Sequence, residues 1–181
     1  LNSASRVLVL GERWQRLLVE EVGIDSTILK VFVMGVPDLS SATMPAREKA
    51  IGLTGLFAGE LGPRKGSPQL LKALLHPGLE RISLVLAGAG SLSTSEVDAE
   101  QLVRAQRLKV LGLVPTERVH EELMKSDFLI LPSKAEGLPV SVIEGLSASR
   151  LVVTTLSGAL SEHLTDGMNC IVIDDPSESA I

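Results

Sequence analysis

Two glutamates, Glu136 and Glu144, flank a Gly-Leu-Pro turn and are the residues of this chain best placed to do chemistry. The aliphatic run 128–131 before them predicts a strand, and residues 140–148 predict a helix. Glu136 is then expected in the loop at the strand's carboxyl end, and Glu144 about a turn and a half inside the helix. Open α/β sheets bind their ligands at this end of the strands. The pair therefore predicts a ligand site at the mouth of such a sheet.

These residue types suit the transfer of a sugar from a nucleotide diphosphate. Carboxylates accept hydrogen bonds from vicinal hydroxyls, so one glutamate can hold a ribose and the other the donor sugar. The departing diphosphate gains negative charge and needs donors aimed at it. Gly137, Leu138 and Pro139 lead into a helix N-terminus with free N–H groups, where a proline at the first helical position loses no needed donor. Lys65, in the Gly/Pro-rich loop 59–66, adds a full positive charge.

A plain structural interpretation stays open for the glutamates. A loop glutamate after a strand is often a solvated surface acid or a helix cap. The context favours a site: a strand, then Pro132 and Ser133, then Glu-Gly-Leu-Pro, then a helix that contains Glu144.

Alternating aliphatic runs and helical patterns predict the elements that position these residues. The predicted strands are 6–10, 28–34, 53–58, 82–87, 110–114, 128–131, 151–155 and 169–173. The predicted helices are 12–22, 68–75, 93–104 (opened by a Ser93/Glu96 capping box), 116–125 (capped by Thr116), 140–148 and 158–164. Short strands separated by helix-length segments predict a Rossmann-like α/β fold, a parallel sheet with helices on both faces and about six βα units after residue 51.

Composition narrows the class of protein. With 181 residues the chain can bury one sizeable core, and its 2% aromatics predict a core of Leu, Val, Ile and Ala, as in strands buried on both faces. A net charge of -5 without a basic stripe argues against nucleic acid as a partner. The single cysteine, Cys170, excludes an intramolecular disulfide and fits a reducing, cytoplasmic compartment. No apolar stretch approaches the roughly 18 residues of a membrane span.

The ordered motifs together resemble the C-terminal, donor-binding half of the GT-B fold glycosyltransferases of group 1 (family 4-like). The resemblance runs in the family's order from residue 53 to residue 173. The matching pieces are 57–59 with Lys65 and Gly66, 84–90, 110–115, 126–127, 131–145, 157–162 and 166–169.

This resemblance implies an enzyme that transfers a hexose, with retention and without a metal or cofactor, as in polysaccharide biosynthesis. The donor would be a nucleotide-diphosphate sugar, UDP or GDP, and the acceptor a carbohydrate or lipid. Glu136 would be the catalytic-site residue that contacts the sugar, and Glu144 would bind the ribose. The other donor-binding residues implied, mostly facing the diphosphate, are Gly59, Arg64, Lys65, Ser133, Gly137, Leu138 and Pro139.

The beginning of the chain resembles the last βαβ piece of the family's N-terminal half. Residues 1–38 would then be the end of that half and the interdomain linker, and 39–181 the donor-binding domain, truncated at its C-terminus. The chain starts at Leu1 and is interpreted as a piece of a larger protein. It would need an acceptor-binding N-terminal domain, in cis or as a partner chain in trans. That domain would also allow a membrane-peripheral location. Alone, these residues should not catalyse transfer.

Departures from the family's pattern keep a second interpretation open. Glu60 stands where the family usually has an arginine beside the diphosphate, and Arg64 is the candidate to replace it. Ser149, Leu151, Ser157 and Cys170 also replace usual family residues. The alternative is a degenerate, non-catalytic Rossmann-like domain with an assembly or regulatory role.

A nicotinamide-dependent oxidoreductase is the least favoured alternative. Gly88-Ala89-Gly90 follows a predicted strand, but Ser93 occupies the place of the third glycine of a dinucleotide fingerprint. His76, His120 and His163 show no metal-binding spacing, and the first two are interpreted as structural.

Overall fold

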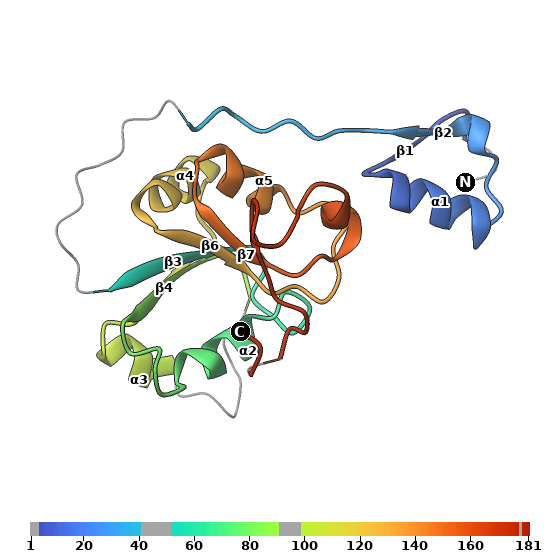
Figure 1. Ribbon diagram of the computed structural model, residues 1–181. Coiled ribbons are helices and arrows are strands. Elements are labelled where there is room, and N and C mark those ends of the chain that lie inside the picture. The colour runs from blue at the N-terminus through green and yellow to red at the C-terminus, as the bar shows by residue number, and fades with distance from the viewer. Residues whose placement is uncertain (1–3, 41–51, 91–98, 178) are drawn as a thin grey trace.

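Six parallel strands, β3 to β8, form the sheet that carries most of the chain (Figure 1). The computed structural model describes residues 4–40, 52–90, 99–177 and 179–181. The strand order is β5-β4-β3-β6-β7-β8, and every neighbouring pair runs parallel. The strands are β3 (Leu53–Ala58), β4 (Ile82–Ala87), β5 (Leu108–Gly112), β6 (Phe128–Leu131), β7 (Leu151–Thr154) and β8 (Ile171–Val172). The predicted Rossmann-like α/β fold is confirmed.

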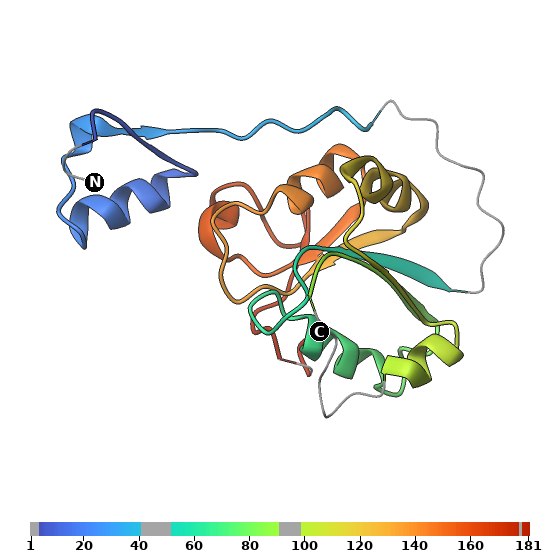
Figure 2. The ribbon, with the colours of Figure 1, turned by 180° about the vertical axis from the view of Figure 1, so that it is seen from behind.

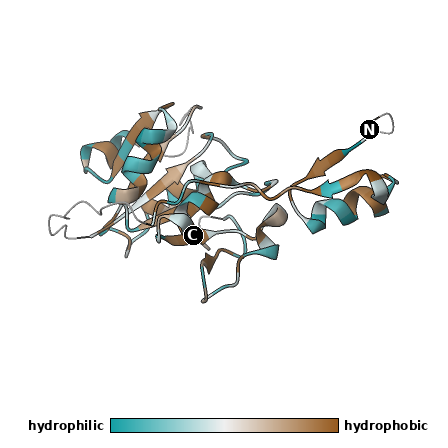
Figure 3. Ribbon diagram, turned by 90° about the horizontal axis from the view of Figure 1, so that it is seen from above, coloured by the Kyte–Doolittle hydropathy of each residue, from teal (hydrophilic) through white to brown (hydrophobic). Residues whose placement is uncertain are grey.

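Helices cover both faces of this sheet. The α-helices are α2 (Ser67–Leu74), α3 (Ala99–Arg104), α4 (Thr116–Lys125) and α5 (Val140–Ser147), and η2 (Gly158–Glu162) is a 3₁₀ helix. The two opposite views place α2 and α3 on one face and α4 and α5 on the other (Figures 1 and 2). All four residues of β6 are buried, as expected for a strand covered on both faces. The apolar colouring follows the strands of the sheet (Figure 3).

The N-terminal segment forms a separate small unit. It consists of β1 (Val7–Val9), α1 (Glu12–Glu20), the 3₁₀ helix η1 (Ser26–Ile28) and β2 (Leu29–Val31). β1 pairs with β2 in parallel, and an extended segment leads from β2 toward the larger domain. Val9, Ile24 and Leu29 form its small core, whereas Leu8 and Val33 are 65% and 75% exposed.

Several predicted boundaries need correction. The strand predicted at 110–114 lies at Leu108–Gly112, because Gly112 has a φ of 69° that ends the strand before Leu113. Thr116 is the first helical residue and not the cap, since Pro115 occupies that position. The strand predicted at 28–34 begins after η1 and is only three residues long.

Other predicted elements are shorter, or lie where the structure is not described. The helix predicted at 158–164 is the short 3₁₀ helix η2, and the last strand has only two residues, Ile171–Val172. The Ser93/Glu96 capping box lies outside the described residues. None of the helices in the described ranges is both long enough and apolar enough to cross a membrane.

A carboxylate from the larger domain caps the first helix of the N-terminal unit. The N–H groups of Glu12 and Arg13 donate to the two carboxylate oxygens of Glu162 at 2.9 and 2.7 Å. Gly11, the N-cap residue of α1, provides no side-chain cap of its own. A Cβ at Gly11 would lie 2.7 Å from Cβ of Ala159 and from an oxygen of Glu162, so only glycine fits there. Glu162 therefore replaces the usual capping side chain and links the two parts of the chain.

We expect Glu162→Gln to loosen the start of α1. Loss of the charged cap should cost about 1 kcal/mol, so the exchange protection of the Glu12 and Arg13 amides should fall about five-fold. Hydrogen–deuterium exchange with amide resolution measures this effect. Glu20→Gln, at the other end of α1, is the matched control and should leave these amides unchanged.

The same interaction has a defined pH dependence. Burial raises the pKa of the Glu162 carboxyl, but the hydrogen bonds from Arg13 and Glu12 outweigh it, and the net pKa lies below the ordinary value. The stabilisation is therefore complete above the ordinary glutamate pKa and is lost as pH falls through the lowered value. Equal protection in Glu162→Gln and the unmodified chain throughout this range would contradict the capping role.

Candidate functional site

The order in which strands are added to the sheet reverses between β3 and β6, and the candidate site lies at this point. From β3 the chain adds β4 and β5 on one side, then returns to place β6, β7 and β8 on the other. In open α/β sheets, the crevice at such a switch point, outside the carboxyl ends of the strands, is the usual ligand site. The loop 59–66 follows β3 and the loop 132–139 follows β6, so both predicted motifs lie at this end of the sheet.

The two loops are joined directly by backbone contacts. The N–H of Lys134 donates to the carbonyl oxygen of Arg64 at 2.9 Å. Gly66, the N-cap of α2, has a φ of 77°, and a Cβ there would overlap the carbonyl group of Pro132. Only glycine permits this close approach, which holds the residues before α2 against the end of β6.

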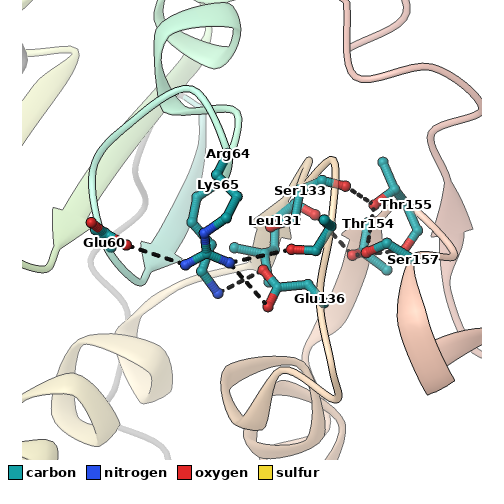
Figure 4. A network of polar contacts seen from close by, with 10 residues as sticks. Glu60, Arg64, Lys65, Leu131, Ser133, Glu136, Thr154, Thr155 and Ser157 are labelled. Atoms are coloured by element: carbon teal, nitrogen blue, oxygen red, sulfur yellow. Dashed lines mark hydrogen bonds and ion pairs between the residues drawn. The ribbon is translucent and has the colours of Figure 1, made fainter. Parts of the chain in front are cut away.

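A short ion pair crosses from one loop to the other. The Lys65 ammonium lies 2.6 Å from Oε1 of Glu136, and the two side chains are only 13% and 7% exposed. Among the residues that the structure describes, this oxygen has no hydrogen bond of good geometry, so the ammonium is its partner by charge (Figure 4). Lys65, predicted to face the diphosphate of the donor, and Glu136, predicted to contact its sugar, thus contact each other.

Arg64 extends this cluster toward the surface. Its guanidinium lies 3.2 Å from the carboxylate of Glu60 and 3.7 Å from that of Glu136, and it donates to the carbonyl oxygen of Ala135. With Lys65, the cluster holds two cations and two carboxylates, and its formal charge is zero (Figure 4). A diphosphate would therefore meet less positive potential here than beside two unpaired cations.

Ser133 lies beneath the second loop. Its hydroxyl is buried and makes no hydrogen bond within the described part of the chain, whereas its carbonyl oxygen accepts one from the Thr155 hydroxyl at 2.5 Å. Thr154 bonds to the carbonyl oxygen of Leu131 in the same way (Figure 4). These threonines of the β7 end fix the backbone where β6 becomes the loop.

The Gly-Leu-Pro turn is held from both parts of the chain. The carbonyl oxygen of Gly137 accepts hydrogen bonds from the N–H of Ala159 at 2.9 Å and the indole N–H of Trp14 at 3.1 Å. Leu138 is buried. Pro139 is the N-cap of α5 and not its first helical residue, which corrects the prediction. Pro139 gives α5 no side-chain cap, and the N–H of Val142 bonds to the carbonyl oxygen of Pro139 at 3.2 Å. Within the described part of the chain this leaves the N–H groups of Val140 and Ser141 for a ligand.

Glu144 is on α5 but does not join the Lys65–Glu136 cluster. Its carboxylate contacts Nε2 of His120, on α4, at 2.8 Å. The sequence interpretation treated His120 as structural and missed this partner. The position of His120 on an amphipathic helix does not predict this contact, because the contact depends on how α4 packs beside α5 in the folded chain. Gly59, in contrast, lies against the Lys65 stem as part of the predicted cluster.

The described residues contain no cluster of three or more His, Cys, Asp or Glu side chains able to hold a metal ion. The positive groups of the two loops and of the helix that follows are Lys65, Arg64, the exposed Lys134 and the N-terminus of α5. This set suits an anionic ligand with hydroxyl groups more than a cation.

The family model described as glycosyl transferases group 1 matches residues 52–181. A glycosyltransferase of Methanocaldococcus jannaschii is 28% identical over 66% of this chain and 33% of its own length. The phosphatidylinositol N-acetylglucosaminyltransferase GPI3 subunit of Saccharomyces cerevisiae is 25% identical over 93% of this chain and 39% of its own. The chain thus spans well under half of these relatives.

Solved structures support the fold. HepE of Anabaena, solved in complex with UDP and glucose, superimposes with a TM-score of 0.74 at 18% identity. The alignment covers 98% of this chain and 51% of that protein. At this identity the match establishes a GT-B type of architecture for the part of the fold present here.

Lys65→Met should destabilise the chain by about 3 kcal/mol, because it leaves the buried Glu136 carboxylate with only the more distant Arg64 guanidinium, at 3.7 Å. The double variant Lys65→Met/Glu136→Gln should recover most of this loss. Urea unfolding of the single and double variants measures both effects. Arg64→Met is the matched control: its own side chain is half exposed and its contact with Glu136 is longer, so the cost should stay below about 1 kcal/mol. Equal losses for Lys65 and Arg64 would show that the short pair has no special role.

Proposed function

Because this chain belongs to the group 1 glycosyl transferases, we propose that it binds a nucleotide-diphosphate sugar at the carboxyl ends of β3 and β6. The glycosyl group would pass, with retention, to a carbohydrate or lipid acceptor. The observation that carries this proposal is the convergence of Lys65 and Glu136 at the switch point of the sheet. Anabaena HepE, with the same fold, was solved with UDP and glucose.

The proposed roles follow from the position of each group. Lys65, Arg64 and the free N–H groups at the start of α5 would face the diphosphate. Glu136 would contact the donor sugar, and Glu144 the ribose hydroxyls. The remaining residues of the proposed site shape the loops around the donor: Gly59, Ser133, Gly137, Leu138 and Pro139.

The Lys65–Glu136 pair is proposed to open when the donor binds. A diphosphate carries more negative charge than a single carboxylate and would attract the Lys65 ammonium away from Glu136. Glu136 would then be released to accept hydrogen bonds from the sugar. Positive side chains and a helix N-terminus would stabilise the leaving diphosphate, so the mechanism we propose needs no metal ion.

We also propose that residues 1–38 are the end of an acceptor-binding half and that 39–181 form the donor domain. A two-stranded sheet with exposed Leu8 and Val33 is too small to be stable alone, which supports a larger N-terminal half in cis or in trans. Catalysis would require that half. A lipid acceptor, as in the name of the yeast relative, would place the protein at the cytoplasmic periphery of a membrane.

A degenerate, non-catalytic domain is the second candidate, and Glu60 is the observation that favours it. Glu60 holds Arg64 in an exposed ion pair at 3.2 Å and cancels its charge beside the proposed diphosphate position. The chain would then have the same fold but would no longer bind the donor nucleotide sugar.

Calorimetric titration with UDP, GDP, ADP and their glucose conjugates tests the proposal. We expect one nucleotide to bind selectively and Glu144→Ala to lose that binding, because the ribose would lose its acceptor. Glu21→Ala, on the N-terminal unit, is the control and should bind as the unmodified chain does. A folded chain that binds none of these nucleotides would contradict the proposal and favour the degenerate domain.

Glu60→Gln should strengthen nucleotide diphosphate binding about 2- to 10-fold at low salt, because it removes a negative charge and frees Arg64. The gain should shrink as salt is raised. Titrations at two ionic strengths measure it, with Glu21→Gln as a control for net charge. An unchanged affinity in Glu60→Gln would place Glu60 and Arg64 outside the donor site.

A further inference from the structure

The carboxylate of Glu144 has one polar partner within the described residues, and it comes from another helix. Oε1 of Glu144 lies 2.8 Å from Nε2 of His120. The side chains are 11% and 18% exposed, so water reaches neither freely. A buried carboxylate is unfavourable without hydrogen bonds, and this contact supplies one.

The contact with His120 involves only one of the two carboxylate oxygens of Glu144. A carboxylate has two oxygens with about four lone-pair positions between them. No hydrogen bond or ion pair of Oε2 is present in the described part of the chain. Oε2 can therefore accept hydrogen bonds from a ligand without breaking the contact to His120.

The choice of a histidine matters for this arrangement. An ionised carboxylate has no hydrogen to donate, so Nε2 of His120 is the donor in this contact. The imidazole donates one hydrogen bond here through a single nitrogen of a planar ring, which fixes the direction of the contact. The Lys65 ammonium, in contrast, forms a short ion pair with Glu136 at the end of a long flexible stem.

The contact with His120 also restricts the side-chain conformations of Glu144. A glutamate side chain has several rotatable bonds, and ordering it on binding would weaken a ligand's affinity. His120 is held on α4 (Thr116–Lys125), which packs on the same face of the sheet as α5. The Glu144 carboxylate is thus oriented before any ligand arrives.

We propose that His120 is a positioning residue for the nucleotide ribose: it holds Oε1 of Glu144 so that Oε2 accepts the ribose hydroxyls. This inference rests on the proposed donor function, in which Glu144 contacts the ribose.

Binding of ribonucleotides and their 2′,3′-dideoxy counterparts tests this role. The probes are UDP, GDP and ADP with the corresponding dideoxynucleoside diphosphates, measured by calorimetry on the whole chain. We expect His120→Ala to reduce the preference for the ribonucleotide about tenfold while affinity for the dideoxy form changes little. His120→Gln, which keeps a donor, should recover most of that preference.

Two controls separate positioning from a structural role. In a Glu144→Gln background, His120→Ala should cause no further change, because the two residues act through one contact. His76→Ala, at the end of α2, should retain the full preference. A folded His120→Ala chain that loses affinity equally for both nucleotide forms, or that keeps the full preference, would overturn the inference. A folded His120→Gln chain that loses as much preference as His120→Ala would also overturn it.

The outcomes also distinguish this inference from the proposed function. Nucleotide binding that depends on Glu144 but not on His120 refutes the positioning role and leaves the donor site standing. A chain that binds no ribonucleotide refutes both.

Discussion

The structure of the candidate site depends on the ion pair between Lys65 and Glu136. It connects the loop after β3 to the loop after β6, across the point where the strand order reverses. Both groups are largely removed from water, so each needs the other, and the loops are held at one separation. An anionic ligand that replaces Glu136 as the partner of Lys65 would keep this balance of charge. The Lys65–Glu136 pair can therefore keep the two loops in position before a ligand binds, with Lys65 already placed to contact a diphosphate.

The surrounding elements preserve the position of these loops. Gly66 allows the first loop to touch the end of β6, and Thr155 holds the carbonyl group at which the second loop starts. Trp14 reaches from the N-terminal unit to the carbonyl oxygen of Gly137, and Glu162 caps α1 from the larger domain. The N-terminal unit thus contacts the turn that would face the donor. Movement of the N-terminal unit would therefore shift the backbone just before α5.

Much of this arrangement could be predicted from the sequence, because it depends on local patterns. The strand before Glu136 is a continuous apolar run, and the strand after residue 52 is apolar apart from Thr54 and Gly55. Their length and spacing specify a parallel sheet. The pairs Lys65–Glu136 and His120–Glu144 could not be predicted, since they join residues far apart in the chain. The capping of α1 by Glu162 was also unpredictable, because Glu162 lies 150 residues after Glu12, whose N–H it accepts. The error in β5 arose at Gly112, whose positive φ ends the strand before the aliphatic run ends.

The most direct test of the account is a crystal structure of this chain with the nucleotide sugar that it binds most tightly. We predict that the Lys65 ammonium leaves Glu136 and contacts a phosphate oxygen, while the Glu136 carboxylate accepts a hydrogen bond from the sugar. The loops 59–66 and 132–139 should keep their backbone contact through Lys134 and Arg64. A bound nucleotide sugar that leaves the Lys65–Glu136 pair intact, or that lies away from the carboxyl ends of β3 and β6, would contradict the account.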